Sequence, residues 1–183
     1  VSTQSTGEAA YSSYKPCFFF VFGEQVQKIE FAAFMWCKYV RKATFPNLRE
    51  IGNSAFEGND LLNTFNAPMC VSIDKSAFAF DVNLRTFRAR PMELAKSVFK
   101  LSGLKSLNLP SVQKVESEAF QQSTISTAKL DNCREFAENA LLNSLGDVVL
   151  GASLIELRLQ LLQISQMAQH QEFKRQMQLV LSE

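Results

Sequence analysis

The sequence predicts an α/β repeat solenoid, in which short coils stack on one another and a parallel β-sheet lines one side. Three observations support this prediction. A small residue followed by a large apolar one recurs at intervals of 21 or 22 residues, an apolar triplet follows each pair, and the chain from Leu154 onward contains neither Pro nor Gly. Self-similarity at such a period is typical of units that cannot bury their apolar side alone and must stack on neighbours.

The repeated pair is the first element of each predicted coil. Six pairs occur, the last of them degenerate: Ala33-Phe34, Ala55-Phe56, Ala77-Phe78, Val98-Phe99, Ala119-Phe120 and Ala140-Leu141. An apolar residue stands four positions before each small residue, from Ile29 in the first repeat to Phe136 in the last. We expect the Phe side chains to form one interior column, while the small residue leaves room for the backbone.

The second element is a short strand after each pair. It is marked by apolar triplets: Val40-Ala43-Phe45, Leu62-Phe65-Ala67, Leu84-Phe87-Ala89, Leu104-Leu107-Leu109, Ile125-Ala128-Leu130 and Leu145-Val148-Leu150. The last two members of a triplet alternate with polar residues, as in a half-buried strand. Stacked coils would therefore align these strands into a parallel sheet on the concave face, with short irregular or helical turns on the convex side.

Three of the four cysteines fit this repeat as structural thiols. Cys37 takes a position that later repeats give to residues able to hydrogen-bond a turn: Asn59, Asp81, Ser102, Ser123 and Ser144. Cys70 and Cys133 share an apolar interior position. Cys17 lies outside the frame, and its role is left open. Because the chain has one histidine and no C-x-x-C pair, metal ligation is not expected.

These repeats resemble the BspA-like leucine-rich repeats, whose unit reads approximately L-x-x-I-x-L-P-x-x-V-x-x-I-x-x-x-A-F-x-x-C. The stretches LNTFNAPMCVSIDKSAFAFD and LKSLNLPSVQKVESEAFQQS match best, and the resemblance covers Gln25 to about Gly151. It implies a leucine-rich-repeat solenoid, and relatives that include surface adhesins, antigens and uncharacterised intracellular proteins. Arg90 in place of proline, Val98 in place of Ala and Leu141 in place of Phe indicate a repeat that decays toward the C-terminal end.

The N-terminal end needs a cover, because a solenoid exposes its core there. Residues 1–15 are rich in Ser and Thr and are predicted to be a flexible leader, with the solenoid occupying residues 16–151. The stretch CFFFVF at 17–22 is expected to supply an incomplete capping strand, with Phe18 and Val21 at strand positions. A membrane-inserting tip is the alternative interpretation.

The C-terminal segment, residues 152–183, is predicted to form one long α-helix. Ser153 and Glu156 match a capping box, and an apolar stripe from Leu154 to Ala168 is expected to cover the last coil. A second stripe, Phe173, Met177 and Val180, begins out of phase with the first. Because so long a helix should overhang the solenoid end, this second stripe is a candidate surface for a partner.

The concave face offers the main candidate binding surface. Alternate strand residues should face outward in two rows, Lys42, Thr64, Thr86, Ser106, Thr127 and Asp147, and Thr44, Asn66, Arg88, Asn108, Lys129 and Val149. The residues predicted to bind a partner are Lys42, Thr64, Asn66, Thr86, Arg88, Arg90, Asn108 and Lys129, with Arg88, Lys129 and Arg90 as anchors. Ser and Thr also favour strands for reasons unrelated to binding, so a solvated surface is the alternative.

Composition and the absence of catalytic motifs argue against several classes of function, namely nucleic-acid binding, membrane spanning and catalysis. The chain carries 19 basic and 18 acidic residues, and the resulting net charge of +1 does not favour binding to nucleic acid or to an anionic membrane. The apolar runs, including those at 17–22 and 31–37, are far shorter than the roughly 20 residues of a transmembrane helix. No nucleophile elbow, phosphate-binding glycine loop or H-E-x-x-H motif is present. We therefore predict a protein without enzymatic activity, cofactor or transmembrane segment.

The predicted function is binding to another macromolecule, most simply a protein. In one version, the concave sheet binds a protein or glycan at a cell surface, as the family resemblance implies. In the other, the chain is a structural subunit of an intracellular assembly, held by the overhanging helix and the Phe-rich N-terminal end. The unpatterned cysteines and the absence of an N-x-Ser/Thr acceptor site favour the intracellular version.

Overall fold

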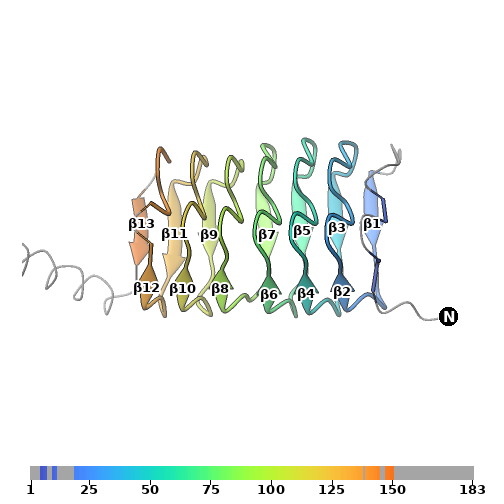
Figure 1. The fold of residues 1–183 in the computed structure, drawn as a ribbon, viewed down its shortest axis with the longest axis horizontal. Coiled ribbons are helices and arrows are strands. Elements are labelled where there is room, and N and C mark those ends of the chain that lie inside the picture. The colour runs from blue at the N-terminus through green and yellow to red at the C-terminus, as the bar shows by residue number, and fades with distance from the viewer. Residues whose placement is uncertain (1–4, 8–9, 12–18, 138, 145–146, 151–183) are drawn as a thin grey trace, which may run out of the picture.

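The computed structural model describes residues 5–7, 10–11, 19–137, 139–144 and 147–150, and this part of the chain is a solenoid of short strands without a helix (Figure 1). One row consists of the odd-numbered strands: β1 Phe20–Phe22, β3 Lys42–Thr44, β5 Thr64–Asn66, β7 Thr86–Arg88, β9 Ser106–Asn108, β11 Thr127–Leu130 and β13 Asp147–Leu150. A second row consists of the even-numbered strands: β2 Lys28–Ile29, β4 Glu50–Ile51, β6 Ser72–Ile73, β8 Glu93–Leu94, β10 Lys114–Val115 and β12 Glu135–Phe136. We call the two outer surfaces the odd-strand face and the even-strand face.

The odd strands confirm the predicted parallel sheet and its register. Val21 of β1 is aligned with Ala43 of β3, which is aligned with Phe65 of β5, and these inward side chains pack on the core. The placement of Val21 at a strand position is therefore confirmed. Phe18, Cys17 and the predicted helix at 152–183 lie outside the described residues.

The predicted aromatic column is also confirmed. Parallel rings stack at centroid distances of 5.0 Å between Phe34 and Phe56, 5.3 Å between Phe56 and Phe78, and 5.9 Å from Phe78 to Phe99. Phe120 continues the stack at 5.9 Å from Phe99. Since each ring is held by those above and below it, the column couples every coil to its neighbours.

The described residues of the predicted leader extend this stack. The Tyr11 ring lies 4.8 Å from that of Phe34 at an interplanar angle of 16°. The Tyr11 N–H donates to the Ala33 carbonyl at 2.9 Å, and the Thr6 N–H donates to the Lys28 carbonyl at 3.2 Å. These contacts place Tyr11 where the repeat puts Phe, so this part of residues 1–15 contacts the first coil. The flexible leader as a whole stays a prediction.

Two left-handed backbone turns close each coil on the convex side. The first falls at Ala32, Ser54, Ser76, Ser97 and Glu118, and the second at Trp36, Gly58, Phe80, Leu101, Gln122 and Asn143, all with φ between 50° and 74°. A left-handed conformation turns the chain sharply without continuing a helix, and it costs a bulky L-residue of order 1 kcal/mol. The irregular turns expected from the sequence therefore have one repeated backbone form.

The three described cysteines are free and buried, in agreement with their structural interpretation. Burial raises the pKa of the Cys37 thiol to about 11 and that of Cys70 to about 12. Burial also raises the pKa of Cys133. A thiol with a pKa so far above neutral forms little thiolate and is a poor nucleophile.

Both rows of strands are interrupted at one joint in the middle of the solenoid. The odd strands form a four-stranded sheet, β1-β3-β5-β7, and a three-stranded sheet of β9, β11 and β13. The even row divides between β6 and β8. The core strand residues Ala43, Phe65 and Phe87 are 22 residues apart, whereas Phe87 and Leu107 are 20 apart, and no strand pairing links β7 with β9.

Backbone and side-chain hydrogen bonds still hold the joint together. The Phe78 N–H donates to the Val98 carbonyl and the Gly103 N–H to the Asp81 carbonyl, each at 3.0 Å. The Arg85 guanidinium donates to the Val82 carbonyl at 3.1 Å and to the Gly103 carbonyl in the next coil. Arg85 thus ties the two halves together where the strands do not.

The residue Gly103 is expected to be essential for close packing at this joint. A methyl group there would overlap both the Arg85 guanidinium and the Val82 carbonyl oxygen. Gly103→Ala should therefore lower the free energy of unfolding by about 1–3 kcal/mol, measured by urea denaturation. Ser106→Ala, on the exposed odd-strand face, is the control and should change it by less than about 0.5 kcal/mol. Equal midpoints for the two variants would contradict close packing at Gly103.

Candidate interaction surfaces

The odd-strand face carries two outward columns of side chains, as the sequence predicted. In the four-stranded sheet the register aligns Phe20, Lys42, Thr64 and Thr86 in one column and Phe22, Thr44, Asn66 and Arg88 in the other. In the three-stranded sheet it aligns Ser106 with Thr127 and Asn108 with Lys129, and β13 continues both columns with Asp147 and Val149. The two predicted rows therefore lie within each sheet as expected.

Most of the predicted partner-binding residues are accessible on this face. Lys42, Thr86, Arg88, Asn108 and Lys129 are exposed, and Thr64 and Asn66 are half-buried. Arg90 lies beyond the end of β7, outside the two columns, and its N–H donates to the Cys70 carbonyl at 2.8 Å. It flanks the face rather than lying in it. The helix candidates Phe173, Met177 and Val180 lie outside the described residues.

The Phe-rich N-terminal end, expected from the sequence as an attachment site, places an exposed aromatic pair on this face, which the predicted binding residues did not include. Phe20 and Phe22 are 70% and 68% exposed, more than any other large apolar side chain that the structure describes. They head the two columns beside Lys42 and Thr44. The sequence contained the information for this outward direction, because side chains alternate along a strand and an inward Val21 places both of its neighbours outward.

The cationic side chains on and beside this face differ in whether they contact another group of the chain. The Lys129 ammonium lies 3.6 Å from the Asp131 carboxylate, and Arg41 stacks on the Phe19 ring at 5.4 Å from its centroid. Lys42 and Arg88 form no ion pair within the described part of the chain. These two side chains are therefore available to an acidic group of a partner.

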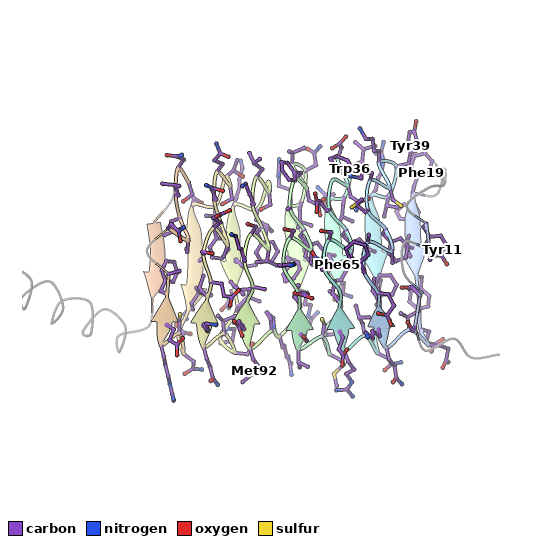
Figure 2. All side chains as sticks on the ribbon, viewed as in Figure 1. Tyr11, Phe19, Trp36, Tyr39, Phe65 and Met92 are labelled. Carbon is purple, nitrogen blue, oxygen red and sulfur yellow. The ribbon has the colours of Figure 1, made fainter. Side chains whose placement is uncertain are left out.

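The even-strand face has a different character, with a groove of about 640 Å³ over β2, β4, β6 and β8. Its charged lining residues are Lys28, Glu30, Glu50, Asp74, Glu93 and Glu116. Some of these are paired: Lys28 with Glu30 at 3.2 Å, and Lys114 with Glu93 at 2.8 Å and with Glu116 at 3.0 Å. Figure 2 labels Met92 at the lower edge of the solenoid, where this groove runs.

Ion pairing keeps the groove carboxylates charged. Hydrogen bonds from Ser5 and Lys28 lower the pKa of Glu30, and a hydrogen bond from Lys114 lowers that of Glu116. Hydrogen bonds to Glu93 and Glu116 raise the pKa of Lys114. Glu30 and Glu116 therefore stay ionised across the neutral range of pH, each in contact with a lysine of the chain.

A metal site and a membrane-spanning helix each place requirements on the residues that the structure describes. Among the residues that the structure describes, no group of three His, Cys, Asp or Glu side chains could hold a metal ion. No helix in the same residues is long and apolar enough to cross a bilayer.

Comparison with known proteins gives a family and a set of similar folds. A family model described as "BspA type Leucine rich repeat region" matches in six copies, over residues 4–127 and 86–163. No curated protein matches the chain.

Three solved structures have similar folds. A leucine-rich repeat protein of T. pallidum is 22% identical with a TM-score of 0.58, covering 74% of each chain. A leucine-rich cell surface protein from Faecalibacterium prausnitzii is 17% identical with a TM-score of 0.56, covering 74% of this chain and 48% of that one. A leucine-rich repeat protein from Bacteroides ovatus is 18% identical with a TM-score of 0.50, covering 70% and 48%.

Proposed function

The chain belongs to the BspA-type leucine-rich repeat family, and from this premise we propose that it is a non-enzymatic module that binds another protein through its odd-strand face. A solenoid presents a broad, rigid surface rather than an enclosed cleft, which suits recognition of a macromolecule. Proteins of this repeat class generally act in protein interaction. The partner and the mode of binding are the subject of the proposal.

The single observation that carries the proposal is the exposure of Phe20 and Phe22 beside unpaired cations. Aromatic side chains and Arg are the residues most often responsible for binding energy at protein interfaces. Phe20 and Phe22 are 70% and 68% exposed, and Lys42 and Arg88 lie in the same two columns. A partner that buries the two rings and offers acidic groups to Lys42 and Arg88 would fit this face.

A cell-surface location fits this function best. The F. prausnitzii protein with a similar fold is described as a cell surface protein, which supports the surface version over an intracellular subunit. The predicted helix at 152–183, with Phe173, Met177 and Val180, remains a second candidate site for a partner. A protein ligand is proposed for the odd-strand face, and nucleic acid is not.

The partner can be captured with a photoreactive amino acid. The full chain with benzoylphenylalanine at Thr86 is expected to cross-link one protein from the medium or cells in which it is found. The same group at Val82, an exposed residue in a turn outside both rows of strands, should not cross-link that protein. Cross-linking from both positions would show that the odd-strand face is not specific.

Removing both aromatic rings is expected to weaken binding of the captured partner at least tenfold. Phe20→Ser with Phe22→Ser deletes exposed side chains, so the fold should be unaffected while the interface loses its apolar anchors. The dissociation constant is measured by calorimetry against the parent chain. Val82→Ser with Met69→Ser removes apolar side chains of 49% and 41% exposure elsewhere and should bind like the parent. Unchanged affinity in the Phe double variant would exclude this surface.

A further inference from the structure

The even-strand face contains a built site for an ammonium group. The Lys114 Nζ lies 2.8 Å from Glu93 Oε1 and 3.0 Å from Glu116 Oε1. Glu93 is aligned with Lys114 on the preceding even strand, and Glu116 follows Lys114 by two residues. The site therefore needs an acid at the aligned position one coil back and a second acid two residues ahead.

The same two acids recur two coils earlier without the lysine. Glu50 is aligned with Ser72 on the preceding even strand, and Asp74 follows Ser72 by two residues. Glu50 thus corresponds to Glu93, and Asp74 corresponds to Glu116. Ser72 stands at the position of Lys114, so both carboxylates are present here without an ammonium at that position.

The missing side chain leaves space that the groove occupies. Glu50, Ser72 and Asp74 all line the groove of about 640 Å³, together with Gly52 and Ala95, whose side chains are absent or small. Neither Glu50 nor Asp74 forms an ion pair within the described residues, although Asp74 Oδ1 accepts the Lys75 N–H at 2.7 Å. The two unpaired carboxylates therefore face a space large enough for a ligand.

Apolar side chains border the same space. Val71 and Met92 line the groove and are 46% and 49% exposed, and Phe31 lies toward its first coil at 48% exposure. A lysine side chain pairs an apolar stem of four methylenes with a terminal ammonium. The border can cover the stem while the two carboxylates bind the ammonium.

We propose that this groove binds a lysine side chain of a partner protein, with the ammonium over Ser72 between Glu50 and Asp74 and the stem against Val71 and Met92. The chain's own Lys114 shows the geometry that the incoming group would adopt. Asp74 is one methylene shorter than Glu116, which leaves additional room for a side chain that enters from outside. The proposal concerns the even-strand face and does not depend on the odd-strand face.

The test uses the full chain and a synthetic peptide, acetyl-Leu-Lys-Leu-amide, followed by NMR of side-chain carboxyl carbons. Saturable shifts are expected at Glu50 and Asp74, and a peptide with an Nε-acetylated lysine should bind at least tenfold more weakly because it lacks the charge. Glu50→Gln with Asp74→Asn should weaken binding of the lysine peptide by a similar factor. Absence of shifts, or equal binding of both peptides, would overturn the proposal.

A substitution that fills the site supplies the matched control. Ser72→Lys should abolish the peptide-induced shifts, because the introduced ammonium takes the proposed position. Thr86→Lys makes the same charge change on the odd-strand face and should leave peptide binding as in the parent. The ammonium introduced at Ser72 should also titrate at higher pH than the one introduced at Thr86. If the two ammonium groups titrate alike, or Ser72→Lys still binds the peptide, the site does not exist.

Discussion

The substitution Phe78→Ala is expected to lower the free energy of unfolding by about 3–5 kcal/mol. Phe78 is fully buried and stacks between Phe56 at 5.3 Å and Phe99 at 5.9 Å. Its ring also meets the edges of Phe65 at 4.7 Å and Phe87 at 5.1 Å. Removing it leaves a cavity in contact with four aromatic rings, which the rigid coils cannot close.

The location of Phe78 adds a second measurable effect. It precedes the joint, across which its N–H donates to the Val98 carbonyl and its ring stacks on Phe99 while the strands do not pair. Because a solenoid is stabilised by contacts between adjacent coils, loss of the ring should separate unfolding of the two halves into two transitions. Urea denaturation followed by circular dichroism measures both effects. Phe80→Ala, at a 37% exposed residue nearby, should cost less than about 1 kcal/mol, and equal losses would contradict the column as the main stabilising element.

The second large effect is expected at Asp81, which is fully buried in the interior. Its Oδ1 accepts the Asn59 N–H at 2.8 Å, but its Oδ2 has no hydrogen-bond partner. Burial is the main cause that raises the pKa of Asp81 well above its usual value. The folded chain therefore holds this carboxyl in its protonated form at pH values where the unfolded chain ionises it.

In the preceding coil, an amide stands at the position of the buried carboxyl and forms hydrogen bonds that Asp81 does not. Asn59 occupies the position of Asp81 one repeat earlier, and its side-chain amide donates to the Phe34 carbonyl at 3.0 Å and to the Phe56 carbonyl. The repeat places the Phe56 and Phe78 carbonyls in the same relation to residue 81. Asp81→Asn should therefore supply two donors where Oδ2 now has no partner.

The stability of the parent chain should consequently depend on pH through Asp81. A folded-state pKa above the unfolded value means that the folded chain binds more protons, so stability is highest below the usual Asp value of 3.8 and falls as pH rises toward the folded pKa. The slope should approach about 1.4 kcal/mol per pH unit within this window. Asp81→Asn should remove this contribution and be more stable than the parent at pH 7.

Urea denaturation from pH 4 to pH 8 measures this difference. The lowered pKa values of Glu30, Glu116 and Glu118 act in the opposite direction, but they are common to both chains and cancel in the comparison. Asp74→Asn removes an exposed carboxylate and should keep the slope of the parent. A variant at Asp81 with the same pH profile as the parent would show that this carboxyl is ionised in the fold.

The features that sequence predicted are those that repeat in residue type. The pairing of small residues with Phe gave the coil length, and alternation in the triplets gave the inward and outward sides of the odd strands, because both follow a fixed period. The left-handed turns were not predictable in the same way. Of the second turn positions, only Gly58 and Asn143 are residue types that favour this conformation, whereas Trp36, Phe80 and Leu101 do not.

Features that depend on contacts between coils could also not be predicted from the sequence. Glu50 and Asp74 are separated by 24 positions and appear in the sequence as isolated charges, and only the register of β4 with β6 brings them to one groove. The joint could not be predicted from spacing, because the 20-residue interval from Phe87 to Leu107 recurs from Ala128 to Val148, where the strands do pair. Phe20 and Phe22 were placed in a capping strand, and their outward direction followed from the inward position of Val21.

The joint between the two halves has a consequence for how such a molecule can change in length. The two stacks share no strand ladder at this seam, where they meet through the aromatic column, backbone hydrogen bonds and the contact of Arg85 with the Gly103 carbonyl. Duplication or deletion of a whole coil within either stack leaves the winding of the other untouched. The seam is therefore a natural position at which one stack of coils could be exchanged for another, by genetic recombination or by an engineer.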